Sequence, residues 1–126
     1  MMAIADLRTG MIDRITSKVG PTIGKVPARR EISYMRQDNQ GHSVLMALDV
    51  DTKKERFVVA LPEHVDNYVW LADGSLLVAQ GSSILHWSPG ETRKQVANFR
   101  SSGFKDMRSL VVSPGGERLA IVEHTE

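Results

Sequence analysis

The stretch Trp70–Gly90, WLADGSLLVAQGSSILHWSPG, places two short apolar runs between three turns. Apolar and β-branched runs of four to eight residues, bounded by glycine, proline or aspartate, are typical of β-strands. Asp73-Gly74 suits a tight turn, because glycine adopts positive φ without steric cost. The stretch therefore predicts strands at 75–80 and 83–87, either as an isolated hairpin or as one copy of a repeat.

Similar apolar runs recur at close spacing along the chain. They lie at 31–35, 43–48, 56–61 and 118–122. A helix needs apolar residues at i, i+3, i+4 and i+7 over eleven or more residues, and turn signals interrupt nearly every such window. Only the stretch around Thr9–Lys18 leaves a helix as an alternative. The sequence predicts an all-β fold.

Two motifs repeat with a period of roughly 42 residues. The copies of the first-hairpin motif are Trp70–Ala79, Val112–Val122 and, in degenerate form, Ala28–Met35. The copies of the second-hairpin motif are Ile4–Gly10, Ala47–Lys53 and Ile84–Gly90. A period of 40 to 45 residues with four antiparallel strands in each unit is typical of propeller blades. The stretch quoted above is then the first hairpin of one blade and the beginning of its second.

These motifs resemble the W-S-P-D-G-x-x-L-A-F repeats of TolB-like propellers, also described as WD40-like or PD40 repeats. The resemblance is carried by Trp70–Val78 and Val112–Ile121, and Asp6–Gly10 and Leu48–Thr52 look like the D-L-x-T-G turn of that family. It spans nearly the whole chain and implies about three blade equivalents. The structural turn residues that it marks are Asp73, Gly74, Gly115 and Gly116.

The repeats divide the chain, taken as one propeller segment over 1–126, into blades and half-blades. A second half-blade is predicted at 1–18, complete blades at 27–61 and 69–99, and a first half-blade at 111–122, with Gly20–Val26 interpreted as a linker. Closed propellers have about four to eight blades. The chain is therefore expected to be a partial propeller or one half of a six-bladed homodimer. The candidate intersubunit edges carry Ile4, Leu7, Leu119 and Ile121.

Composition excludes several classes of partner and chemistry. Sixteen basic and fifteen acidic residues leave a net charge of +1, so neither nucleic acid nor an anionic membrane is an expected partner. No run is long enough for membrane insertion, no signal peptide is expected in this chain, and the absence of cysteine rules out disulfides. The basic pairs Arg29-Arg30 and Lys53-Lys54 are interpreted as solvated turn residues. The compartment stays open, although the resemblance implies a periplasmic or secreted parent protein.

No catalytic or metal-binding motif is complete. Gly20–Val26 has three residues rather than four between its glycines and lacks Ser or Thr after Lys25, so it does not match a phosphate loop. Asp49–Lys53 begins like a calcium loop but has lysine at a ligand position. The histidines lack the short spacing of a metal anchor; they are His42, His64, His86 and His124. No Gly-x-Ser-x-Gly motif is present. We therefore expect no cofactor and no enzyme activity.

The aromatic residues suggest where a partner would bind. Trp70 is expected in the core between blades, whereas Trp87, with Tyr68 beside it, is a candidate binding anchor. By analogy of fold, the chain is predicted to be a non-catalytic protein-binding or scaffold module of the TolB-like type with a protein partner. The alternative is an accessory domain that gates a prolyl-oligopeptidase-like hydrolase, whose catalytic domain lies outside this chain. A small-ligand or metal site in a central channel is a third hypothesis.

Overall fold

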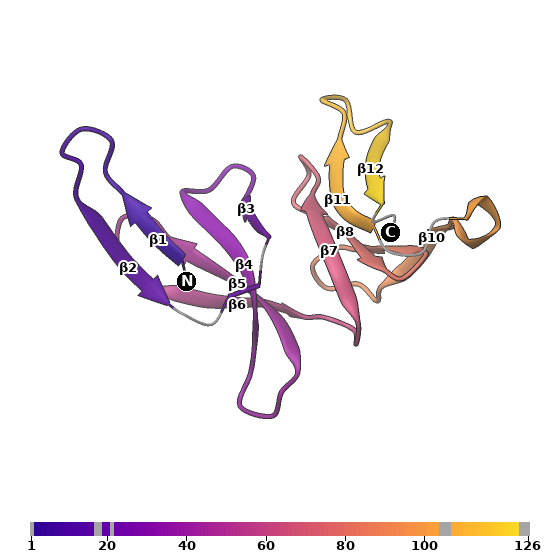
Figure 1. Cartoon of the computed structure of the whole chain (residues 1–126), viewed down its shortest axis with the longest axis horizontal. Coiled ribbons are helices and arrows are strands. Elements are labelled where there is room, and N and C mark those ends of the chain that lie inside the picture. Colours follow the sequence, from indigo (N-terminus) through magenta and orange to yellow (C-terminus); the bar gives the residue numbers. More distant parts are fainter. Residues whose placement is uncertain (1, 17–18, 21, 104–106, 124–126) are drawn as a thin grey trace. The chain divides into compact units, whose positions relative to one another are not determined.

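The computed structural model describes residues 2–16, 19–20, 22–103 and 107–123. This part of the chain forms twelve β-strands in four antiparallel sheets and one short 3₁₀ turn, Arg100–Ser102. It divides into two compact units, Met1–Leu61 and Pro62–Glu126, each with one two-stranded and one four-stranded sheet (Figure 1). The predicted all-β fold is confirmed, and no sheet among the described residues closes on itself.

The first unit holds a four-stranded meander in the order β3-β4-β5-β6 and a separate hairpin, β1-β2. Its strands are β1 (Met2–Ala5), β2 (Ile12–Thr16), β3 (Ile23–Lys25), β4 (Glu31–Gln37), β5 (Ser43–Asp49) and β6 (Glu55–Ala60). The helical alternative around Thr9–Lys18 is wrong, because β2 occupies its described part.

The first four-stranded sheet begins earlier than the repeat suggested. Residues Gly20–Val26, interpreted as a linker, contain strand β3, which pairs with β4 from Ile23 opposite Tyr34 to Lys25 opposite Ile32. This strand has only three residues, and Gly24 interrupts its apolar pattern. It forms because β4 offers a free edge, which no local sequence signal reveals.

The core of the first unit lies between the hairpin β1-β2 and one face of the larger sheet. Its buried residues are Met2, Tyr34, Val44, Met46 and Leu48, and Ile4, Ile15, Val19 and Ile32 pack against them. Side chains alternate between the faces of a strand, so Val44, Met46 and Leu48 share one face of β5. The hydrophobic effect on this shared face holds the two sheets of the unit together.

The second unit has the same composition of sheets in reverse sequence order. Its meander follows the order β7-β8-β9-β10, and β11-β12 forms the hairpin. The strands are β7 (Val65–Trp70), β8 (Leu76–Gln80), β9 (Ser83–Trp87), β10 (Lys94–Asn98), β11 (Met107–Val112) and β12 (Leu119–Glu123). The hairpin packs on the meander through Ala79, Ile84, Met107 and Leu110, with Leu119 and Ile121 against them. The strands predicted from Trp70–Gly90 are confirmed as β8 and β9.

Irregular pairing repeats from hairpin to hairpin. One extra residue interrupts the ladders β1-β2, β5-β6 and β9-β10, at Ile15, Val58 and Val96. A second recurrent bulge lies at residue 66 between β7 and β8 and at residue 108 between β11 and β12. A β-bulge is a specific feature of a strand pair, so its recurrence at corresponding positions shows that the chain repeats one supersecondary unit.

The bulges correct one alignment made from sequence. The ladder shifts between Leu45 and Met46 in β5, and between Ile84 and Leu85 in β9. Ile84 thus corresponds to Leu45 and not to Ala47, a displacement of two residues from the motif alignment. The third copy of the second-hairpin motif, Ile84–Gly90, lacks the aspartate by which the other two copies were aligned, so its alignment depended on residue composition alone. Because strands have a period of two, the displacement left the assignment of faces intact.

Candidate functional site

Each four-stranded sheet carries two of its three turns at the same end. Antiparallel strands reverse direction at each turn, so the first–second and third–fourth connections share one end, here named the turn end. In the first unit the turn end comprises residues 26–30 and 49–54, and the turn 6–11 of β1-β2 belongs with them. Exposed ion pairs of the unit, Arg30–Asp51 and Lys53–Asp13, lie here, which makes this end the candidate functional site.

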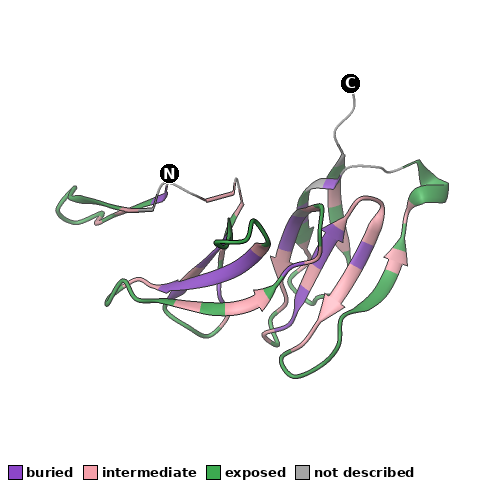
Figure 2. Cartoon of the chain, turned by 90° about the horizontal axis from the view of Figure 1, so that it is seen from below, coloured by how far each residue is buried: buried purple, intermediate pink, exposed green. Residues whose placement is uncertain are grey.

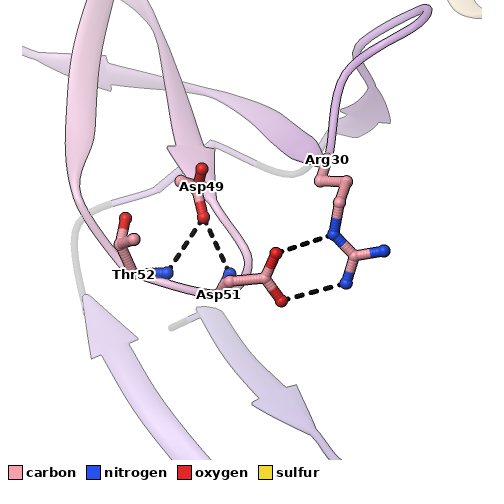
Figure 3. Close-up of polar contacts among 4 residues, drawn as sticks. All are labelled: Arg30, Asp49, Asp51 and Thr52. Atoms are coloured by element: carbon pink, nitrogen blue, oxygen red, sulfur yellow. Dashed lines mark hydrogen bonds and ion pairs between the residues drawn. The ribbon is translucent and has the colours of Figure 1, made fainter.

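Aspartate side chains cap the β5-β6 turn and the equivalent β1-β2 turn in the same way. Asp49 Oδ1 accepts hydrogen bonds from the backbone N–H groups of Asp51 and Thr52, both at 2.9 Å (Figure 3). Asp6 Oδ1 accepts from Arg8 at 2.8 Å and Thr9 at 3.3 Å. These N–H donors lower the pKa of Asp49, with Thr52 contributing most. The D-L-x-T-G resemblance therefore corresponds to a self-capped turn, which positions backbone and not a reactive carboxylate.

Arg30 connects the two turns of the first four-stranded sheet. Its Nε and Nη2 donate to the two carboxylate oxygens of Asp51 at 2.7 and 2.9 Å (Figure 3). The Val50 N–H also donates to the Arg30 carbonyl at 3.0 Å. The Arg30 guanidinium lowers the pKa of Asp51 by hydrogen bonding and by its charge. Both side chains are exposed, so the pair contributes little to stability but presents charges in a fixed geometry.

Lys53 connects the turn of the larger sheet to the hairpin β1-β2. Its Nζ lies 3.1 Å from Asp13 Oδ2. The backbone of Lys53 has a φ of 60°, which matches the φ of 77° at Gly10 in the equivalent turn. Arg30 and Lys53 are turn residues, as predicted, but each has an acidic partner. Their sequence neighbours gave no signal for these pairs, which arise from strand pairing.

Glu31 and Arg56 form an ion pair that sequence reasoning missed. Glu31 is only 9% exposed, and its carboxylate accepts two hydrogen bonds of 2.8 Å from Arg56. These hydrogen bonds are the main reason that the pKa of Glu31 is lowered. The charge of Glu31 at the first position of a buried strand indicates a paired residue. The sequence does not identify its partner, because Arg56 lies 25 residues away on β6. The pair supports the turn end from within the sheet.

Tyr34 contributes a buried hydroxyl to the same unit. It lies in the core face of β4, and its hydroxyl has no hydrogen-bond partner among the described residues. Burial raises the pKa of Tyr34, and the nearby Glu55 carboxylate adds to this effect. Burial therefore favours the neutral, protonated form of this hydroxyl.

First–second turns share a backbone pattern in both units. The Gly74 N–H donates to the Leu71 carbonyl at 3.0 Å, and the Gly116 N–H donates to the Ser113 carbonyl at 2.8 Å. The φ values of 88° at Gly74 and 73° at Gly116 lie in the left-handed region that favours glycine, whereas Gly115 has ordinary φ. The degenerate copy keeps the pattern, with the Arg29 N–H donating to the Val26 carbonyl at 3.4 Å.

Asp73 adds a side-chain cap to the first–second turn of the second unit. Its Oδ1 accepts hydrogen bonds from the N–H and the hydroxyl of Ser75. The pKa of Asp73 is lowered chiefly by the Ser75 hydroxyl and then by the Ser75 N–H. Asp73 lies in the first–second turn of this sheet, and His86 lies near the end of β9 at the same turn end.

Trp87 lies at this turn end and is partly exposed, whereas Tyr68 is buried. Trp87 is the last residue of β9, pairs with Leu76 and is partly exposed beside the turn at Ser88–Glu91. Tyr68 is only 3% exposed within β7. Trp70, expected in the core, is partly exposed at the end of the same strand. Of the two candidate anchors, Trp87 is the side chain that a partner can contact.

The predicted intersubunit residues lie on two strands and one turn. Ile4 is half-buried in β1, and Leu119 and Ile121 are half-buried in β12. Leu7 lies beyond the end of β1, in the turn, and is 98% exposed. Among the described residues β1 pairs only with β2, and β12 pairs only with β11, so each strand has one unpaired edge.

The described residues contain neither a metal-binding cluster nor a membrane-spanning helix. No three histidine or acidic side chains gather there in a metal-binding arrangement. His42 lies 3.8 Å from Asp38 at the β4-β5 turn, and His124 lies outside the described residues. No helix in this part of the chain has the length and apolar character needed to cross a membrane.

Comparison with known proteins gives no match to a family model, to a curated protein or to a solved structure. The internal repeat and the turn geometry are therefore the basis for the proposals that follow.

Proposed function

We propose that the chain is a segment of a TolB-like β-propeller and a non-catalytic protein-binding or scaffold module. Support for blades comes from the four-stranded antiparallel meanders and from bulges that recur at Ile15, Val58 and Val96. Support for a binding role comes from the turn ends. Propellers present loops from successive blades on one face, and such a face suits protein recognition.

Trp87 carries the binding proposal. It is a large, partly exposed aromatic residue at a turn end, and the polar residues Asp73 and His86 lie near the same end of the sheet. Aromatic residues surrounded by polar groups dominate the energy of many protein interfaces. In the first unit, the exposed Arg30–Asp51 pair supplies fixed charges of both signs, which favour orientation of a partner over strong affinity.

The test is affinity capture with the wild-type chain and two aromatic variants. W87A removes the proposed anchor, and F57A removes another exposed aromatic, on β6 and away from the turn end, as a matched control. Thermal melting first establishes that both variants fold. Proteins retained by the wild type and by F57A, but reduced at least tenfold by W87A, support the proposal. Equal retention by all three chains contradicts it.

A further inference from the structure

Among the described residues, each hairpin has an unpaired strand edge that corresponds to a paired edge in the four-stranded sheets, on β1 in the first unit and on β12 in the second. Within the described residues, β1 (Met2–Ala5) pairs on one side with β2, and β12 (Leu119–Glu123) pairs on one side with β11. An unpaired edge presents free N–H and C=O groups that can pair with another strand. Hairpins of two strands are also marginal by themselves, because they bury little apolar surface.

The two hairpins bury complementary sets of residues. In β1, Met2 and Ile4 face the core of the first unit, whereas Ala3 and Ala5 are exposed. Figure 2 shows that the hairpin at the N-terminus is exposed over much of its length. In β12, Leu119 and Ile121 face the core of the second unit. Each hairpin therefore has one covered face and one bare face, as the halves of a sheet lying between two other sheets would have.

The two four-stranded sheets supply a register for pairing β12 with β1. In the first sheet, the second and third strands pair with Ile32 opposite Leu48. In the second sheet, they pair with Leu76 opposite Trp87. Strand β1 corresponds to β5 at a distance of 43 residues, because the same bulge, on the following strand, interrupts both ladders. Strand β12 corresponds to β8 at the same distance. Both templates give one register for β12 against β1: Leu119 opposite Ala5, Ala120 opposite Ile4, Ile121 opposite Ala3 and Val122 opposite Met2.

This register aligns covered residues with bare ones. Half-buried Leu119 and Ile121 continue the face of Ala5 and Ala3, and exposed Val122 continues the face of Met2. Large apolar residues stand on the bare faces, where a joined sheet would cover them. They are Ile12 at 65% exposure, Val111 at 63% and Val122 at 58%. A slip of one residue would destroy this match, because every side chain would change face.

We propose that a second copy of this chain completes the sheet, with β1 of each copy adding antiparallel to β12 of the other. Reciprocal pairing leaves neither edge unpaired in either copy. Two copies then hold four complete sheets and two completed ones, within the range of about four to eight blades that closed propellers use. Pairing within a single copy would give only three sheets. The proposal is independent of what binds at Trp87.

The test uses disulfide trapping, since the chain contains no cysteine. A3C and I121C are co-expressed, oxidised and separated on a non-reducing gel. Opposed residues of paired strands lie at about 4.5–5.5 Å, within the range that a disulfide spans. We expect a linked species at twice the chain mass of 14.0 kDa when both variants are present, and none when either is present alone.

Register and folding controls make the result decisive. A3C with A120C is one residue out of register and on the opposite face, so it should not link. If melting shows that I121C does not fold, I4C with A120C tests the same register. No link from a folded in-register pair overturns the proposal, and so does equal linking of the A3C and A120C control. A double variant, A3C/I121C, that forms only an intrachain disulfide also overturns it, because the chain then closes on its own edges.

Discussion

Single side chains fix the turns and the strand ends of this protein. Asp49 and Asp6 cap their own turns through backbone N–H groups, and Glu31 is held by two hydrogen bonds from Arg56. The contribution of such contacts to the free energy of unfolding depends on how far they are buried. An exposed pair such as Arg30–Asp51 is screened by solvent, whereas Glu31 is largely removed from water.

E31Q should lower the free energy of unfolding by about 1–3 kcal/mol at neutral pH, because a charge-assisted, largely buried pair is lost. The pKa of Glu31 is lowered from its ordinary value of 4.5. Its stabilising effect is thus present above that value and is lost as the pH falls through the lower folded-state pKa. The wild-type advantage over E31Q should shrink between pH 6 and pH 3 in urea melts, and an advantage independent of pH contradicts this. D51N, at an exposed pair, should change stability less.

Two adjacent glycines provide a second test at the residue scale. Gly116 has a φ of 73°, so G116A should destabilise the second unit by about 1 kcal/mol. Gly115 has ordinary φ, and an added Cβ would meet Glu117 Oε1 at 3.4 Å, the edge of ordinary contact. G115A should therefore leave the denaturation midpoint nearly unchanged. Equal losses from the two variants would contradict a preference for glycine based on φ, because an added Cβ at Gly116 meets no atom within 4 Å.

At the scale of elements, position in the sheet decides how strongly a strand is held. Strand β5 pairs on both sides and is buried over most of its length, whereas β10 pairs with β9 alone among the described residues and is mostly exposed. The first strand, β3, is the shortest of its sheet and depends on the edge of β4. Local stability should therefore fall from the central strands to the outermost ones.

Hydrogen exchange measures this gradient directly. Amides of Leu45–Leu48 in β5 should exchange most slowly, and those of Lys94–Asn98 in β10 should exchange much faster. Proteolytic fragments or residue-resolved spectra of the full chain distinguish the two segments. If β10 were as well protected as β5, its outer edge would have to be covered by another chain.

At the scale of the whole molecule, the unpaired edges and exposed faces of the hairpins make the stability of the fold depend on association. If β1 and β12 pair between copies, the folded state contains a dimer, and its melting temperature must depend on concentration. A tenfold increase in concentration should stabilise the dimer by about 1.4 kcal/mol. Light scattering should give twice 14.0 kDa at the upper concentration.

A120D supplies the matched variant for that measurement. Ala120 is exposed on β12 in a single copy, so the aspartate should be tolerated there. In the paired sheet it would face Ile4, where an unpaired charge is costly. A120D should remain folded at the mass of one chain and melt at a temperature independent of concentration. A wild-type melting temperature that does not vary with concentration contradicts association.

The amino-acid sequence by itself determined the all-β fold, the positions of most strands and the repeated turns. These features depend on contacts between residues close in the chain, such as the Asp49 cap or the φ of Gly74, so residue types reveal them. Only the tertiary structure decided the short strand β3, the Glu31–Arg56 pair and which face of β1 and of β12 is buried within its own unit. The reason is that strand pairing brings together residues distant in sequence, and an edge or a partner on another strand leaves no local pattern.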